Sequence, residues 1–213
     1  MRARPRVPRV GSRLRASRRP SSARAGLCAP PWHGVTATTP TRTATDLLRW
    51  APSYIGLAVL DEWAHRGVVS PDDVRNLLAR LRGQRFVAKA RRLAELCEPA
   101  TESHGESWMR LRIVDAGLPR PEVQIPVVLG GRELYRLDAG YPELRLGFEY
   151  DGEEWHRGAQ IAADEARRDD LLHRFGWTVV AATREKVLGA RPAIERVVAD
   201  LIGWAGPVAR REW

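Results

Sequence analysis

The sequence predicts an α/β domain in the second half of the chain, with the element order αβββαβα, preceded by a helical segment and a disordered basic tail. Three observations support this organisation. After residue 101, β-rich runs alternate with helical patterns. Between residues 41 and 98, apolar residues recur at helical spacing between clear start and stop signals. Residues 1–34 are rich in Arg, Pro, Ser and Ala and have no hydrophobic period.

The basic tail carries almost all of the net charge of +9. Residues 1–45 contain ten Arg and no Lys, Asp or Glu, whereas the rest of the chain holds 25 basic and 26 acidic residues. The folded part is therefore nearly neutral, and overall charge gives little support for nucleic-acid binding. Residues 1–34 have a functional interpretation, a basic arm that touches phosphates, and a structural one, either a flexible tail or a stretch translated upstream of the true start.

The helical segment spans residues 35–100. Ser53 to Ala64 carries apolar residues at helical spacing, and Gly67 ends this helix. Ser70-Pro71-Asp72-Asp73 is a strong helix start, with serine as N-cap and proline at the first helical position. The sequence therefore predicts helices over 53–64, 70–81 and 84–97.

The α/β domain spans residues 101–206 and is followed by a short tail, 207–213. A helix is predicted first, with Gly117 just past its end, and Gly130-Gly131 suits a hairpin turn between two strands. The predicted helices are 103–116, 159–175 and 192–204, and the predicted strands are 123–128, 134–138, 144–151 and 177–183.

Acidic residues gather on the middle strands of this domain. Side chains alternate along a strand, so Glu149 and Asp151 share one face, and the apolar residues from Leu144 to Tyr150 take the other. Asp138 precedes a predicted turn over 139–143 and folds back beside them. Neighbouring carboxylates repel each other, and Mg²⁺ or Mn²⁺ would relieve that repulsion.

A family resemblance rests on three strings. They are RLDAGYPELRLGFEYDGEEWH at 136–156, ESWMRLRIVDAGLPRPEVQ from Glu106, and FGW at 175–177. The region over 101–204 resembles the restriction-endonuclease-like PD-(D/E)XK superfamily, in particular its very-short-patch-repair branch and bacterial endonuclease-domain proteins. The resemblance implies a restriction-endonuclease-like mixed sheet flanked by helices and Mg²⁺-dependent hydrolysis of DNA phosphodiester bonds.

The resemblance also implies roles for individual acids. Asp138 and Glu149 match the superfamily's metal ligands; the alternative is two surface acids paired with Arg136 and Arg145. Asp151 stands where the superfamily usually has a lysine. It would be a further metal ligand or a base, or else a turn residue, since Asp-Gly favours turns.

Two more residues carry a functional and a structural interpretation each. His156 matches a trailing histidine of the repair branch, which implies an acid/base role or a phosphate contact; the alternative is a capping or surface residue. Glu106 matches an acid on the superfamily's first helix, near the metal. Ser103 to Glu106 also spells S-x-x-E, a capping box in which Glu106 serves the helix start.

The string VTATTPTRTATDLLRW, at the start of the helical segment, supports a second resemblance. It resembles a segment of relatives in which a winged-helix module, like that of abortive-infection antitoxins, precedes the nuclease-like domain. Here only the Arg-rich tail precedes the string. We therefore expect the chain to lack the helix pair that reads a DNA sequence.

These inferences predict a Mg²⁺- or Mn²⁺-dependent DNA endonuclease with catalytic residues Glu106, Asp138, Glu149, Asp151 and His156. One alternative is a catalytically inactive DNA-binding or antitoxin-like regulator, which the missing lysine and the near-neutral body favour; another is a truncated product without function. DNA is the expected partner, RNA stays open, and a homodimer or an accessory protein would supply specificity. Two cysteines and no bilayer-length apolar run predict a cytoplasmic protein.

Overall fold

The computed structural model describes residues 36–152, 158–211 and 213, with side chains left out for 158–162. The predicted tail, residues 1–34, and the predicted site residue His156 lie outside the described residues. The chain divides into two units, Met1–Thr39 and Pro40–Trp213. All the helices and strands named below belong to the second unit.

The helical segment contains four helices: α1 (Pro40–Trp50), α2 (Ser53–His65), α3 (Pro71–Arg80) and α4 (Val87–Glu95). The three predicted helices are confirmed as α2, α3 and α4, whereas α1 was not predicted as a separate helix. Pro71 occupies the first turn of α3 as expected. Their apolar faces meet in one buried cluster, to which Leu111 of the following helix also contributes. Its fully buried leucines are Leu48, Leu57, Leu60, Leu78, Leu93 and Leu111.

A four-stranded mixed sheet forms the centre of the second half. Its order is β1 (Glu122–Leu129), β2 (Arg132–Tyr141), β3 (Leu146–Asp151), β4 (Thr178–Thr183). The first three strands are antiparallel, and β4 lies parallel to β3 after a crossover through α6 (Gly158–Phe175). The other helices are α5 (His104–Asp115), α7 (Arg184–Leu188) and α8 (Ile194–Leu201). The predicted α/β class is confirmed, and the observed order adds only α7 to the predicted one.

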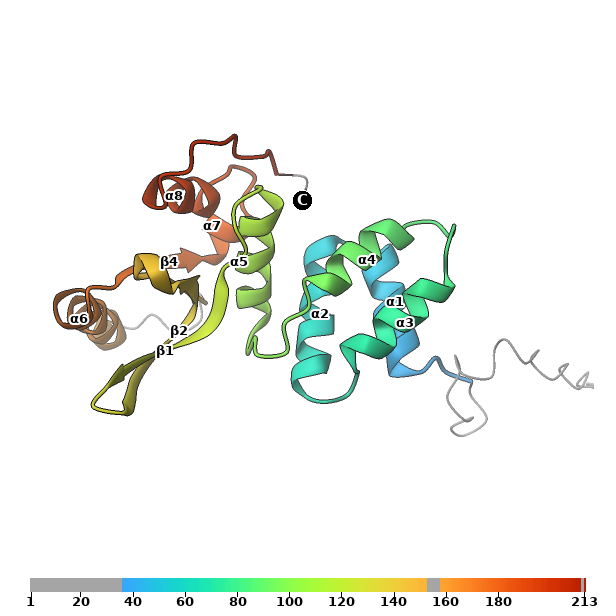
Figure 1. Cartoon of the computed structure of the whole chain (residues 1–213), viewed down its shortest axis with the longest axis horizontal. Helices are drawn as coiled ribbons and strands as arrows, with labels where there is room; N and C mark the ends of the chain where they lie inside the picture. Colours follow the sequence, from blue (N-terminus) through green and yellow to red (C-terminus); the bar gives the residue numbers. More distant parts are fainter. Residues whose placement is uncertain (1–35, 153–157, 212) are drawn as a thin grey trace, which may run out of the picture. The chain divides into compact units, whose positions relative to one another are not determined.

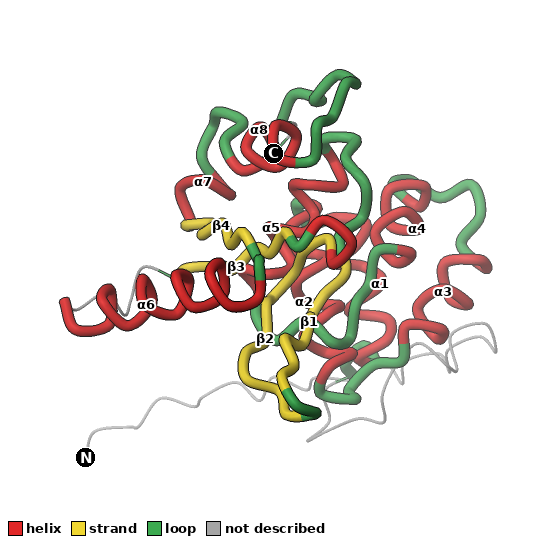
Figure 2. Tube along the Cα trace, turned by 60° about the vertical axis from the view of Figure 1, so that its left-hand side comes forward, coloured by secondary structure: helices red, strands yellow, loops and turns green. Residues whose placement is uncertain are grey.

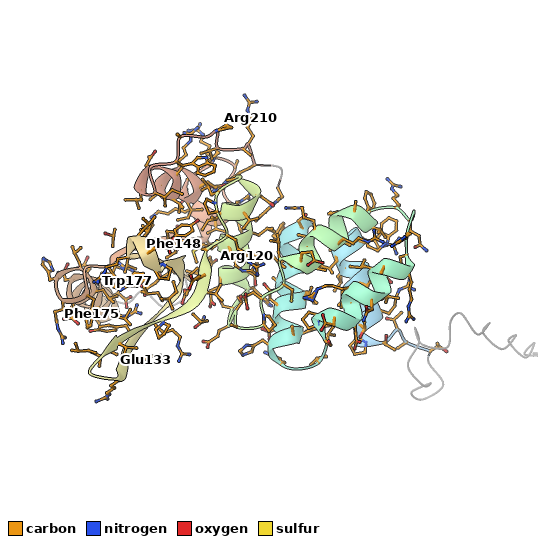
Figure 3. The ribbon with its side chains drawn as sticks, in the orientation of Figure 1. Arg120, Glu133, Phe148, Phe175, Trp177 and Arg210 are labelled. Atoms are coloured by element: carbon orange, nitrogen blue, oxygen red, sulfur yellow. The ribbon has the colours of Figure 1, made fainter. Side chains whose placement is uncertain are left out.

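Helices cover both faces of the sheet (Figure 1). On one face, Phe148 packs in a cluster with side chains of α5, α7 and α8. On the other face, Leu171 of α6 packs with Leu137 and with Trp177, which follows α6. Figure 2 shows one end of α6 beside β3 and β4, and Figure 3 labels Phe148 and Trp177. Among the described residues, no helix has the length and apolar character needed to cross a membrane.

Two turns connect the antiparallel strands, and one was predicted in the wrong place. Gly130 and Gly131 both have positive φ, as the predicted hairpin turn requires. The turn predicted over 139–143 is wrong, because β2 continues to Tyr141 and the chain reverses at a short 3₁₀ helix, Pro142–Leu144. Arg145 then adopts a left-handed conformation (φ 48°) and returns the chain into β3.

Candidate functional site

The candidate site is an acidic cluster, which we define as Glu106, Asp138, Glu149 and Asp151. Glu149 and Asp151 lie on β3, and their side chains face α6. The side chain of Phe148, which precedes Glu149, is fully buried on the opposite face, against α5, as alternation along a strand predicts. The register that pairs Ala139 with Phe148 brings Asp138 of β2 to these residues. The Asp138 carboxylate accepts a hydrogen bond from the backbone N–H of Tyr150 at 2.8 Å.

The cluster makes Asp138 difficult to ionise. Burial, together with the negative charges of Glu106 and Glu149, raises the pKa of Asp138 to about 7, against the lowering effects of the Tyr150 hydrogen bond and Arg167. The side chain is thus poised to gain or lose a proton near neutral pH. Such a pKa is common at functional sites but also occurs in buried structural clusters.

Two arginines of α6 supply positive charge to the cluster. Arg167 donates from Nη1 to Glu149 and from Nη2 to the carbonyl of Arg136 at 3.0 Å. Arg168 lies 4.0 Å from the carboxylate of Asp151. Acids and arginines together line an open pocket of about 210 Å³, formed by Asp138, Glu149, Tyr150, Asp151, Asp164, Arg167 and Arg168.

The ion pairs expected from the sequence for Asp138 and Glu149 are not the ones observed. Arg136 instead pairs with Glu133 at 2.8 Å. Arg145 donates to the backbone carbonyl of Phe175. The observed partner of Glu149 comes from α6, 18 residues away in sequence, because the crossover helix returns across this face of the sheet.

Glu106 combines features of both its interpretations. Its backbone N–H donates to Ser103 Oγ at 3.2 Å, and its carboxylate accepts from the backbone N–H of Glu102 at 3.0 Å, so it caps the start of α5. The same carboxylate accepts from Gln124 Nε2 at 3.0 Å. Its charge also reaches Asp138. Glu106 is therefore a structural cap that also belongs to the acidic cluster.

As arranged, these residues do not fit a metal ion. Within residues 36–152, 158–211 and 213, no three His, Cys, Asp or Glu side chains gather closely enough to hold one. A guanidinium group already pairs with Glu149, and a divalent cation there would have to compete with it. Binding of Mg²⁺ or Mn²⁺ by Asp138, Glu149 and Asp151 stays a prediction.

A second candidate feature was missed in the sequence: a basic–aromatic surface, which we define as Trp50, Arg82, Arg85, Phe86 and Lys89. Trp50 is 56% exposed and Phe86 41% exposed, and their rings meet edge to face at 5.1 Å. The signal was present in the string from Arg80 to Arg92, which holds six basic residues and no acidic one. The overall charge balance concealed this local excess.

The cations of this surface lie close to its aromatic rings. The guanidinium carbon of Arg85 is 4.6 Å from the Phe86 ring centroid, and Lys89 Nζ is 5.9 Å from it. Phe86 has a left-handed backbone (φ 62°), which is strained for a residue with a bulky side chain. Arg49, which is buried below, fixes the loop by donating twice to the carbonyl of Arg85 at 3.2 and 3.1 Å.

Comparison with known proteins gives one family match and two relatives. Residues 3–98 match the family model described as AbiEi antitoxin C-terminal domain. Two uncharacterized proteins of Mycobacterium tuberculosis, MT2308 of strain CDC 1551 and Rv2248 of strain H37Rv, are each 35% identical over 147 residues. The aligned region covers 69% of this chain and 54% of each relative, so the chain spans about half the length of the curated relatives it matches. No solved structure matches the chain.

The family match corrects the nuclease assignment. The matching family model is that of an antitoxin domain and not of a PD-(D/E)XK or very-short-patch-repair nuclease, so the assignment to that superfamily, with its endonuclease terms, is wrong. The fold also gives two of the acids in the resembling strings structural partners: Glu149 pairs with Arg167, and Glu106 caps α5. The antitoxin-like alternative fits the match better.

Proposed function

We propose that this chain is a non-catalytic regulator of the antitoxin type that binds DNA through its basic–aromatic surface. The observation that carries the proposal is the concentration of exposed arginine and aromatic side chains on the loop between α3 and α4, together with Trp50 at the end of α1. This surface lies inside residues 3–98, the part that resembles an antitoxin domain. That resemblance also implies a toxin as protein partner.

The chemistry of the surface suits a nucleic acid. Arginine and lysine bind phosphates and release condensed counterions, which supplies most non-specific affinity for DNA. Exposed aromatic rings add stacking or apolar contacts to bases and sugars. Arg82 and Arg85 are exposed and carry no acidic partner among the interactions of the described residues, so both are available for phosphate contacts.

The non-catalytic part of the proposal is supported by the acidic cluster. Arg167 of α6 pairs with Glu149, and Arg168 approaches Asp151, whereas metal-dependent hydrolysis would require free carboxylates around a cation. The cluster is consistent with a structural role between β2, β3 and α6.

The test is DNA binding by anisotropy, in EDTA and over a series of salt concentrations, using wild type and Arg82→Ser/Arg85→Ser. We expect the double variant to bind at least about tenfold more weakly near 0.1 M salt, with a salt slope smaller by about two. The matched control is Arg132→Ser/Arg196→Ser, which removes the same charge from exposed positions elsewhere.

Equal loss in both double variants would mean that DNA responds only to net charge, and it would overturn the assigned surface. Unchanged binding in the Arg82/Arg85 variant would overturn it as well. Thermal unfolding of each variant checks that the fold is kept. It should be, because Arg49 bonds to the backbone of Arg85 and not to its side chain.

A further inference from the structure

A second concave site, which we call the arginine pocket, lies between α5, α8 and the C-terminal segment. Its volume is about 290 Å³. Its charged lining consists of Arg92, Arg112, Asp115, Glu195, Arg210 and Arg211. Among the described residues, the lining thus contains four arginines and two acids, an excess of two positive charges, with Arg210 at the rim. The pocket shares no residue with the acidic cluster or with the basic–aromatic surface.

Arg112, on α5, forms the floor of this pocket. Its side chain is 2% exposed, and its Nε donates to the carbonyl of Val187 at 2.7 Å. Its Nη2 is buried and has no hydrogen-bond partner among the residues that the structure describes. Burial and the positive charge of Arg211 lower the pKa of Arg112 to about 10. A buried guanidinium that lacks a full set of acceptors is costly, and an added anion would relieve that cost.

The two carboxylates of the pocket are already engaged by other groups. Glu195 pairs with Arg211 at 2.6 Å and lies 3.9 Å from Arg112 Nε. Asp115 pairs with Arg92 at 2.5 Å. Each acid therefore already has another arginine as its partner, and neither neutralises Arg112 exclusively. Arg210 stands at the rim and extends outward in Figure 3.

Aromatic side chains and the C-terminal segment fix Arg112 in place. The indole of Trp213 lies 3.5 Å from the guanidinium carbon of Arg112 and stacks on Tyr54 at 5.1 Å. Its Nε1 donates to Asp115 at 2.6 Å. The segment itself is held by a backbone hydrogen bond from Ala209 to Ala116 at 3.0 Å. Because the indole covers a face of the guanidinium group, the N–H groups at the edge can still donate to an anion in a bidentate manner.

We propose that the arginine pocket binds a small, doubly charged oxyanion: a phosphate group, either free or at the end of a small phosphate ester. Two excess positive charges match the charge of such a group. Guanidinium forks match its oxygen geometry, and the volume suits a ligand at the small end of the usual range. The floor of the pocket is a single buried guanidinium group, which favours a small anion over the continuous backbone of a nucleic acid.

The test is calorimetric titration with inorganic phosphate at constant ionic strength. Wild type is compared with Arg112→Gln and with Arg92→Ala. Arg92→Ala changes a half-exposed residue and so guards against a folding defect in Arg112→Gln. We expect both variants to weaken phosphate binding at least about tenfold, the loss expected for one charge-assisted hydrogen bond. Arg196→Ala, an exposed change on α8 outside the pocket, should bind like wild type.

A second titration uses adenosine 5′-monophosphate to separate the two sources of the phosphate group. Tighter binding than inorganic phosphate assigns the pocket to phosphate esters, and equal or weaker binding assigns it to the free ion. No binding of either compound to wild type up to about 10 mM, where even a millimolar site would fill, overturns the proposal. Equal binding by wild type and both pocket variants also overturns it. DNA binding that depends on Arg112, without phosphate binding, would assign the pocket to nucleic acid instead.

Discussion

Helix α5 contributes to two clusters of charged side chains, and they are built differently. On the side of the helical segment, Arg110 pairs with Asp61 at 2.5 Å, and both side chains are 1% exposed. Asp61 also accepts from Ser107 Oγ at 2.7 Å and from the backbone N–H of Glu98 at 2.8 Å. Asp61 is therefore paired with one arginine, and its carboxylate oxygens also accept hydrogen bonds from Ser107 and Glu98.

The acidic cluster lacks this balance. Burial is the largest cause of the raised pKa for both Asp61 and Asp138. Arg110 opposes the rise for Asp61, whereas Glu106 and Glu149 add to it for Asp138. Desolvation thus acts on a carboxylate paired with an arginine in one place and on a carboxyl group among like charges in the other, and the latter titrates near neutral pH.

The largest effect should come from breaking the balanced pair. Arg110→Met leaves Asp61 buried without its counter-charge, so we expect a loss of about 3–5 kcal/mol in the free energy of unfolding. Urea denaturation measures it. Arg66→Ala, which removes an exposed ion pair with Glu62 on α2, should cost below about 1 kcal/mol. Similar losses in the two variants would show that the Asp61–Arg110 pair is not structural.

Next in size is the effect of Asp138→Asn, and it depends on pH. The folded-state pKa of about 7 lies above the ordinary value of 3.8, so the folded protein holds the proton more tightly than the unfolded chain. Asp138 therefore favours the folded state most at low pH, and this contribution is lost as pH rises through about 7.

Asparagine stays neutral at every pH. We expect Asp138→Asn to match wild type near about pH 4 and to be more stable by on the order of a few kcal/mol near about pH 8. Urea midpoints at several pH values measure the difference. A variant less stable than wild type at the higher pH would contradict the account of this cluster.

A smaller effect is expected from Arg167→Gln. Arg167 lowers the pKa of Asp138 and pairs with Glu149, so its loss should move the titration of Asp138 above neutral pH. Carboxyl NMR shifts followed against pH measure this. Arg174→Gln, on the same helix but paired with Asp170, should leave the titration of Asp138 unchanged. An unchanged titration of Asp138 in both variants would show that Arg167 does not influence Asp138.

The smallest predicted effect is the difference in stability loss between alanine substitutions at two serines that precede helices. Ser103 accepts a hydrogen bond from the backbone of Glu106, so Ser103→Ala should cost about 1 kcal/mol. Ser70 also precedes a helix, but its side chain makes no capping hydrogen bond, so Ser70→Ala should cost clearly less. Thermal unfolding compares them. Equal costs would mean that the α5 cap does not help to position Glu106.

The elements that were predictable are those with local signals. Apolar periods, the proline at the start of α3, and the glycine pair at the hairpin each depend on residues close in sequence. The turn between β2 and β3 was misplaced because Gly140 resembles a turn residue. In the structure its Cα faces the carbonyl of Leu146 so closely that a side chain would not fit. α7 was missed because five residues carry too little periodicity.

The candidate site was only partly predictable for the same reason. Alternation along β3 correctly placed Glu149 and Asp151 on one face. Their neighbours Arg167 and Arg168 could not be predicted, because the pairing depends on where the crossover helix lies. The basic–aromatic surface was hidden because its excess charge is cancelled elsewhere in the chain.

The measurement that tests the central claim most directly combines DNA binding and DNA cleavage. Wild type and Asp138→Asn/Glu149→Gln would be incubated with supercoiled plasmid in EDTA, in Mg²⁺ and in Mn²⁺. Affinity would be read by gel shift and nicking by conversion to the open circle. A non-catalytic regulator should bind in EDTA, nick in none of the conditions, and bind equally in both proteins. Metal-dependent nicking by wild type that disappears in the double variant would contradict the account.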